Sequence, residues 1–183
     1  LAIQKETSLC TFYGPALLTQ FGEQPEALPY TREYFFKALC EDQPIGYVHE
    51  SNEYTDDFLN WLDKEDLTRA RRFLCDKRRI WLRGGSATGP LNGGCITSLQ
   101  HLRGTKYWPK FNGSLFFWDI PENENLSQGV SYSVVDSMLT DLDLSGVFSQ
   151  ISGMIVGRPY GYSKESESEL VSIIIERTKS ENR

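Results

Sequence analysis

No apolar run in the sequence approaches the roughly 20 residues that a helix needs to cross a bilayer, which argues against a membrane protein. The chain has only two histidines, His49 and His101, and no cysteine pair in C-x-x-C spacing. A zinc site of the usual kind is therefore excluded, and no metal is expected. The glycine-rich stretch 84–94 lacks both common phosphate-loop patterns. We interpret this stretch as a turn that brings two backbones close.

Cysteines are few and far apart, which excludes a compact disulfide framework. This spacing favours free thiols in a reducing, cytoplasmic compartment. A disulfide stays open as an alternative, because a sequence does not measure proximity. The four residues are Cys10, Cys40, Cys75 and Cys95.

Positive charge is also scarce: 19 Lys and Arg stand against 25 Asp and Glu, for a net charge of −6. This balance argues against nucleic acid as a partner, since binding to it depends on basic side chains. The one basic cluster is short, and we interpret it as a solvated helix face. Its members are Arg69, Arg71, Arg72, Lys77, Arg78 and Arg79.

What the sequence does contain is a strand and helix alternation in its second half. Apolar runs predict strands at 114–120 and 151–156, and apolar stripes predict helices at 131–142 and 164–177. Strand, helix, strand, helix indicates an α/β fold with a parallel crossover. The nearly continuous apolar run at 114–120 is typical of a strand that is covered on both faces.

Signals in the first half are weaker. A helix from Thr31 to about Leu39 would bury Tyr34, Phe35, Ala38 and Leu39, and Thr55 is placed to begin a short helix. The remaining predicted elements are the tail of a helix at 1–8, strands at 10–13, 44–49 and 80–82, a helix at 97–102, and disorder at 179–183.

Asp119 is the most informative single residue. It closes an apolar strand, and open α/β sheets bind ligands beyond the carboxyl ends of their strands. Glu122 and Glu124 follow, so a paired-carboxylate glycosidase is one alternative, although acids in a turn are usually solvated. His49 and His101 are interpreted as structural histidines.

Four segments, in this order and spacing, resemble the LD-carboxypeptidase and microcin C self-immunity peptidase family. They read TFYGP at 11–15, GGCITSL and LRGTKYWP within 93–109, GSLFFWD at 113–119 and GVFSQISGMIVGRP at 146–159. The aromatic-rich middle of the chain is more similar to the immunity-type peptidases. The fold that this resemblance implies is the C-terminal α/β domain of an LD-carboxypeptidase-like fold at 44–183. Residues 1–43 would be the tail of a Rossmann-like N-terminal domain.

The resemblance implies a serine peptidase whose serine attacks, whose histidine acts as base and whose glutamate orients the histidine. The serine is expected just before Leu1 and the histidine after Arg183, so the chain as given lacks both. The implied reaction is amide hydrolysis near the C-terminus of a small peptide or peptidyl-nucleotide. It needs no cofactor or metal, and the full-length protein is expected to be a homodimer. A non-catalytic binding domain of the same family is the alternative.

The resemblance assigns functions to three residues of this chain. Asp119 stands where the family has the orienting Glu, and its side chain is shorter by one methylene, roughly 1.5 Å. Residues 51–57 read SNEYTDD and resemble the family's substrate loop, with Tyr54 in the place of a tryptophan. Tyr54 and Trp61 are thus expected to bind substrate. The alternative, that both rings pack beneath the loop, stays open.

Overall fold

The computed structural model describes residues 1–75, 79–124 and 128–179, and it divides into two compact units. One unit joins Leu1–Thr11 to Trp81–Arg183, and the other is Phe12–Ile80. We call them the sheet unit and the loop unit. The predicted boundary between 1–43 and 44–183 refers to domains of the family and stays a prediction. Within the described stretches, no helix is long and apolar enough to cross a membrane.

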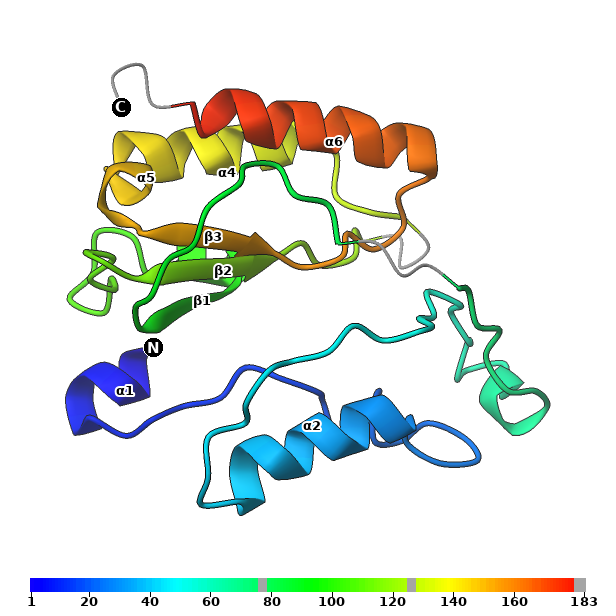
Figure 1. The fold of residues 1–183 in the computed structure, drawn as a ribbon. Helices are drawn as coiled ribbons and strands as arrows, with labels where there is room; N and C mark the ends of the chain where they lie inside the picture. Colours follow the sequence, from blue (N-terminus) through cyan, green and yellow to red (C-terminus); the bar gives the residue numbers. More distant parts are fainter. Residues whose placement is uncertain (76–78, 125–127, 180–183) are drawn as a thin grey trace. The chain divides into compact units, whose positions relative to one another are not determined.

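The sheet unit is built on three parallel strands in the order β1-β2-β3 (Figure 1). The strands are β1 (Leu91–Cys95), β2 (Leu115–Asp119) and β3 (Gly153–Val156). The connections run through helices α3 (Ile96–Gln100), α4 (Tyr132–Leu144) and α5 (Val147–Gln150), and α6 (Lys164–Arg177) follows β3. This arrangement confirms the predicted α/β fold, its parallel crossover and the elements α3, β2, α4, β3 and α6.

Helices α4 and α6 pack side by side on one face of the sheet (Figure 1). From β2, Phe116 and Trp118 point into this face and are fully buried. They meet the apolar stripes that the sequence predicted on the two helices, because side chains alternate along a strand and recur every three to four residues on a helix. The buried helix residues are Val135, Leu139, Leu142, Leu170 and Ile174.

Strand β1 corrects the prediction of a turn in the glycine-rich stretch. Its residues LNGGC are poor strand formers, yet they pair along their whole length with β2. The pairing depends on close approach: a Cβ at Gly93 would lie 1.7 Å from the carbonyl oxygen of Phe117. The expectation that these glycines bring two backbones close is therefore confirmed, although the structure that does so is a strand.

The second face of the sheet differs from the prediction for β2. On that face Leu91 is 61% exposed and Ile155 is 53% exposed, whereas Leu115 and Phe117 are half-buried. The strand is therefore fully covered on the α4 and α6 face alone. Parallel sheets are usually covered on both faces, so the exposed apolar side chains on the second face of this sheet are unusual.

Helix α1 (Ala2–Thr7) is the predicted helix at 1–8, and it ends at Ser8 in the left-handed conformation. Lys5 Nζ donates to the carbonyl of Trp108 at 3.3 Å, and Glu6 pairs with Lys106. Leu1 packs against the core cluster. The first residues of the chain thus belong to the sheet unit, although more than 90 residues separate them from their partners.

The loop unit holds α2 (Pro29–Cys40) and a short 3₁₀ turn, η1 (Glu65–Leu67). Helix α2 begins two residues earlier than predicted, because Pro29 occupies its first turn, where a proline is favoured. Its predicted stripe is only half-buried, and Leu39 is 43% exposed. The described members of the basic cluster are not on a helix. Arg69, Arg71, Arg72 and Arg79 lie outside all helices and strands, and Lys77 and Arg78 lie outside the described residues.

Three predicted strands are absent, although residues 10–13, 44–49 and 80–82 are all described. The clearest cause is at 44–49, where Gly46 has a φ of 72° and interrupts the extended run. Side chains of α2 satisfy the backbone there instead of a neighbouring strand. Tyr30 donates to the His49 carbonyl at 2.6 Å, and the His49 amide donates to Tyr34 Oη at 2.8 Å.

The predicted short helix at Thr55 is also absent. Thr55 Oγ1 accepts from the amide of Asp57 at 3.1 Å, which closes a turn rather than capping a helix. Of the stretch predicted to be disordered, residues 180–183 lie outside the described residues. All four cysteines are free thiols in the structure, as the sequence favoured.

Candidate functional site

Asp119 is the last residue of β2, and its register partner is Cys95, the last residue of β1. Because successive side chains point to opposite faces, Asp119 lies on the face away from the buried ring of Trp118. Its side chain is half-buried. The predicted position of Asp119, at the carboxyl edge of the sheet, is confirmed; its role stays a prediction.

Gly157, the residue after β3, lies next to the Asp119 side chain. Its amide donates to the carbonyl of Trp118 at 2.8 Å, which extends the pairing of β2 and β3 by one residue. A Cβ at Gly157 would lie 2.9 Å from the Cβ of Asp119. The glycine therefore leaves the space that the Asp119 side chain occupies.

Cys95 is a neighbour of Asp119 that the sequence pattern did not reveal, because the glycine-rich stretch was interpreted as a turn. Its Sγ lies 3.0 Å from Thr97 Oγ1, at the start of α3. The strand register alone brings this thiol beside the carboxylate. A prediction of β1 as a strand parallel to β2 would have found it.

The chain segments that follow β2 and β3 are tied together at the same edge. Glu122 forms an antiparallel bridge with Gly129, and the Gly129 amide donates to the carbonyl of Gly161 at 3.4 Å. Tyr162 donates its hydroxyl to the carbonyl of Val130. Glu122 and Glu124 are both exposed, as expected for acids in a turn.

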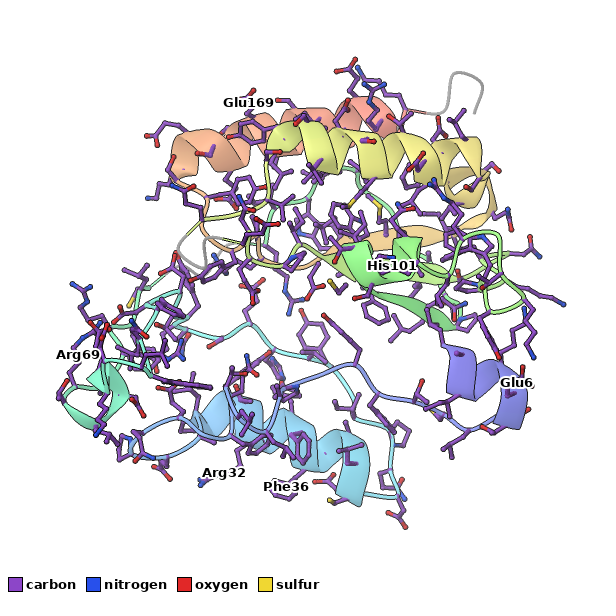
Figure 2. All side chains as sticks on the ribbon, turned by 180° about the vertical axis from the view of Figure 1, so that it is seen from behind. Glu6, Arg32, Phe36, Arg69, His101 and Glu169 are labelled. Carbon is purple, nitrogen blue, oxygen red and sulfur yellow. The ribbon has the colours of Figure 1, made fainter. Side chains whose placement is uncertain are left out.

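Neither histidine lies at a strand end of this edge. His101, labelled in Figure 2, is exposed and directly follows α3, which begins after Cys95. His49 belongs to the loop unit, where its ring contacts that of Tyr47 with centroids 4.9 Å apart. Both side chains are exposed, and the interpretation as structural histidines stays a prediction.

Tyr54 and Trp61 lie seven residues apart in the loop unit. Tyr54 is half-buried, and its backbone forms a two-way bridge with Leu74. Trp61 is 48% exposed and lies in the turn before η1. About half of the Trp61 surface is therefore open, and the roles of Tyr54 and Trp61 in binding substrate stay predictions.

Comparison with known proteins decides the family. The model of the LD-carboxypeptidase C-terminal domain matches residues 88–182, which include all three strands and the Asp119 edge. The chain belongs to the LD-carboxypeptidase family. The family resemblance and the α/β fold expected from the sequence are both confirmed.

The curated relatives are longer proteins. The microcin C7 self-immunity protein MccF of Escherichia coli is 29% identical over 158 residues, which are 85% of this chain and 43% of MccF. YocD of Bacillus subtilis (strain 168) is 30% identical over 179 residues, which are 97% of this chain and 50% of YocD. The chain thus spans about half the length of the relatives it matches.

Solved structures of family members have a similar fold. MccF in complex with aspartyl sulfamoyl adenosine superposes with a TM-score of 0.78 at 26% identity, over 97% of this chain and 52% of the MccF chain. An MccF variant in complex with adenosine monophosphate superposes with a TM-score of 0.74 at 26% identity, over 98% of this chain and 52% of that chain. The likeness extends over both units of this chain.

Proposed function

We propose that this chain contributes the orienting carboxylate and part of the substrate site of a serine peptidase. The substrate would be a small peptide or peptidyl-nucleotide, cleaved at an amide near its C-terminus. The observation that carries the proposal is Asp119, at the carboxyl edge of a parallel sheet inside the matched family domain. The chain spans about half the length of its relatives, and we assign the nucleophilic serine and the basic histidine to the other half of such a protein.

The chemistry assigned to Asp119 is electrostatic and geometric. A serine Oγ attacks the amide carbonyl and passes its proton to the histidine, which then carries a positive charge. The carboxylate accepts a hydrogen bond from the other ring nitrogen, fixes the tautomer and stabilises the imidazolium. The histidine then protonates the leaving amine, and water releases the acyl group from the serine. An aspartate performs this role in many triads, so the loss of one methylene relative to glutamate requires only that the histidine lie closer.

Nucleotide recognition is assigned to the aromatic side chains of the loop unit. MccF binds both aspartyl sulfamoyl adenosine and glutamyl sulfamoyl guanosine, which differ in their base. Stacking on an aromatic ring tolerates such a change, because every base has a π-face. Tyr54, in the motif position, and the half-exposed Trp61 would supply these rings here.

The experiment that tests the proposal is a product analysis with two substrates, a peptide ending in an LD-linked residue and a peptidyl-nucleotide. The natural protein is incubated with each, and the products are measured by mass spectrometry. Cleavage of either substrate at the C-terminal amide supports the peptidase. If the protein binds the nucleotide but cleaves neither substrate, it is instead the non-catalytic binding domain that the sequence left as an alternative.

Tyr54→Ala is expected to weaken binding of adenosine monophosphate by about tenfold, because the loss of one stacked ring costs about 1–3 kcal/mol. Isothermal titration calorimetry gives the affinity directly. Tyr54→Phe keeps the ring and serves as the matched control, with an affinity within about twofold of the natural protein. Equal binding by the alanine variant would remove Tyr54 from the site.

Gly157→Ala is expected to lower kcat about tenfold while KM changes little, and to destabilise the sheet unit by about 1–2 kcal/mol. The added Cβ would press on the Cβ of Asp119 at 2.9 Å, whereas the next two contacts, at 3.5 and 3.6 Å, are ordinary. A displacement of a fraction of an ångström at a catalytic group is enough for such a loss. Steady-state kinetics measure kcat and KM, and a thermal unfolding curve measures stability. Full activity in a stably folded variant would contradict a role for the Asp119 position.

A further inference from the structure

Two segments of the loop unit, 54–57 and 69–74, are joined by a set of hydrogen bonds that we call the Asp57 bracket. Tyr54 and Leu74 exchange backbone hydrogen bonds of 2.9 and 2.8 Å. Thr55 Oγ1 donates to the carbonyl of Arg72 at 2.8 Å. The bracket thus holds the Tyr54 backbone in place from a segment almost 20 residues away in sequence.

Asp57 is the centre of the bracket. Arg69 donates to it with both terminal nitrogens, at 2.6 and 3.2 Å, and the amide of Arg72 donates at 2.9 Å. The Asp57 side chain is only 10% exposed. The hydrogen bonds from Arg69 hold the pKa of the Asp57 carboxyl well below its usual range, so it is charged at neutral pH. Figure 2 labels Arg69 next to the 3₁₀ turn.

The bracket is anchored beyond its own two segments. Arg71 Nη1 donates to the carbonyl of Asp57 at 2.9 Å, and Arg71 Nε pairs with Glu23 at 2.8 Å. The Glu23 side chain is 9% exposed. A charged chain of contacts therefore runs from Glu23 through Arg71 to the backbone of Asp57.

The segment that the bracket encloses, 58–68, carries Trp61. Its turn is closed by hydrogen bonds between Asn60 and Glu65, from the Asn60 amide to Glu65 Oε2 at 3.0 Å and from the Glu65 amide to the Asn60 carbonyl at 3.1 Å. Leu59, at the base of the turn, is 4% exposed. Tyr54 thus lies in the base of this loop and Trp61 at its tip, and Asp57 lies between them in sequence.

We propose that Asp57 is a positioning residue, which sets the placement of the Tyr54 and Trp61 rings for nucleotide binding without contacting the nucleotide. The proposal rests on the proposed function, which assigns those rings to the substrate. A pre-ordered loop binds more tightly because less conformational entropy is lost on binding. Without the charge on Asp57, the hydrogen bonds from Arg69 and Arg72 are fewer and weaker, and the two segments separate more often.

The test compares Asp57→Asn with Asp56→Asn, which removes the same charge from the exposed neighbouring side chain. Asp57→Asn is expected to weaken binding of adenosine monophosphate about tenfold, as expected when a hydrogen-bonded charge pair is broken. It should also speed hydrogen exchange of the Tyr54 and Leu74 amides while exchange in β2 is unchanged. Where hydrolysis is measured, KM should rise and kcat should stay within about twofold. Asp56→Asn should match the natural protein in every measurement.

Arg69→Lys gives a second, milder variant in case Asp57→Asn unfolds the loop unit. It keeps the charge but loses the two-pronged geometry, so its affinity should lie between those of the natural protein and Asp57→Asn. Unchanged affinity or unchanged exchange in Asp57→Asn would overturn the positioning role alone. Absence of nucleotide binding by the natural protein would overturn the ligand assigned under the proposed function and the positioning role with it.

Discussion

Asp119→Ala is expected to lower kcat for amide hydrolysis by about 10³- to 10⁴-fold, the loss seen when the orienting carboxylate of a catalytic triad is removed. Without the carboxylate, the histidine loses its tautomer and orientation, and the positive charge that forms on it is no longer stabilised. Substrate binding depends on other groups, so KM should change little. Steady-state kinetics on whichever substrate the natural protein cleaves give both parameters.

Two further variants make this result specific. Glu122→Ala removes an exposed acid three residues beyond the strand end and should retain full activity. Asp119→Glu restores the family residue and should retain activity within about tenfold, because both charge and direction are kept. An alanine variant that retains activity would contradict the role of Asp119. Loss of activity in Glu122→Ala would show that the effect is not specific to the carboxylate at the strand end.

Gly93→Ala is expected to destabilise the sheet unit by at least about 3 kcal/mol, near the upper end of the cost of overpacking. The new Cβ would lie 1.7 Å from the Phe117 carbonyl oxygen and 2.7 Å from its carbon, and both are backbone atoms of β2. They can move only if β1 separates from β2. The same separation would disturb the Cys95 and Asp119 pair two residues further along, so activity should fall as well.

The control for this variant is Gly84→Ala. A Cβ at Gly84 would meet nothing within 4 Å, so its free energy of unfolding should change by less than about 0.5 kcal/mol. Denaturant unfolding followed by fluorescence measures both variants. If Gly93→Ala is as stable as Gly84→Ala, the close pairing of β1 and β2 is wrong.

The second half of the fold was predictable because local pattern and tertiary burial agree there. The apolar run of β2 places Phe116 and Trp118 in the core, and the stripe of α4 places Leu139 there. Each element has enough apolar residues for its period to be detected. Even so, the stripe is imperfect, because Val134, an apolar residue of the same helix, is 40% exposed.

Elsewhere the structure depends on contacts between residues that are distant in sequence, and no local pattern reports these. Strand β1 has no strand propensity of its own and exists because its glycines fit against Phe117. In the loop unit, the Asp57 bracket joins residues 12 and 15 positions apart through side-chain hydrogen bonds. Asp56 and Asp57 are equivalent to any sequence pattern, yet only Asp57 is enclosed by arginines.

In the candidate site, too, the sequence indicates the residues that follow a local pattern and misses those that depend on long-range contacts. Asp119 could be located because it ends an apolar strand, and its match to the family's orienting acid stays a prediction. Cys95 could not, since its proximity to Asp119 follows from the register of a strand that the sequence did not predict. Tyr54 and Trp61 are predicted to bind substrate from the sequence, whereas the bracket that holds their loop required the structure.

The central claim is that the natural protein is a serine peptidase whose triad is completed by Asp119. The most direct measurement is labelling of the natural protein with a serine-reactive phosphonate, with the modified residue located by peptide mass spectrometry. We expect a single serine to be labelled and to react far more slowly in Asp119→Ala. Absence of labelling, or labelling at equal rates in both proteins, would contradict the claim.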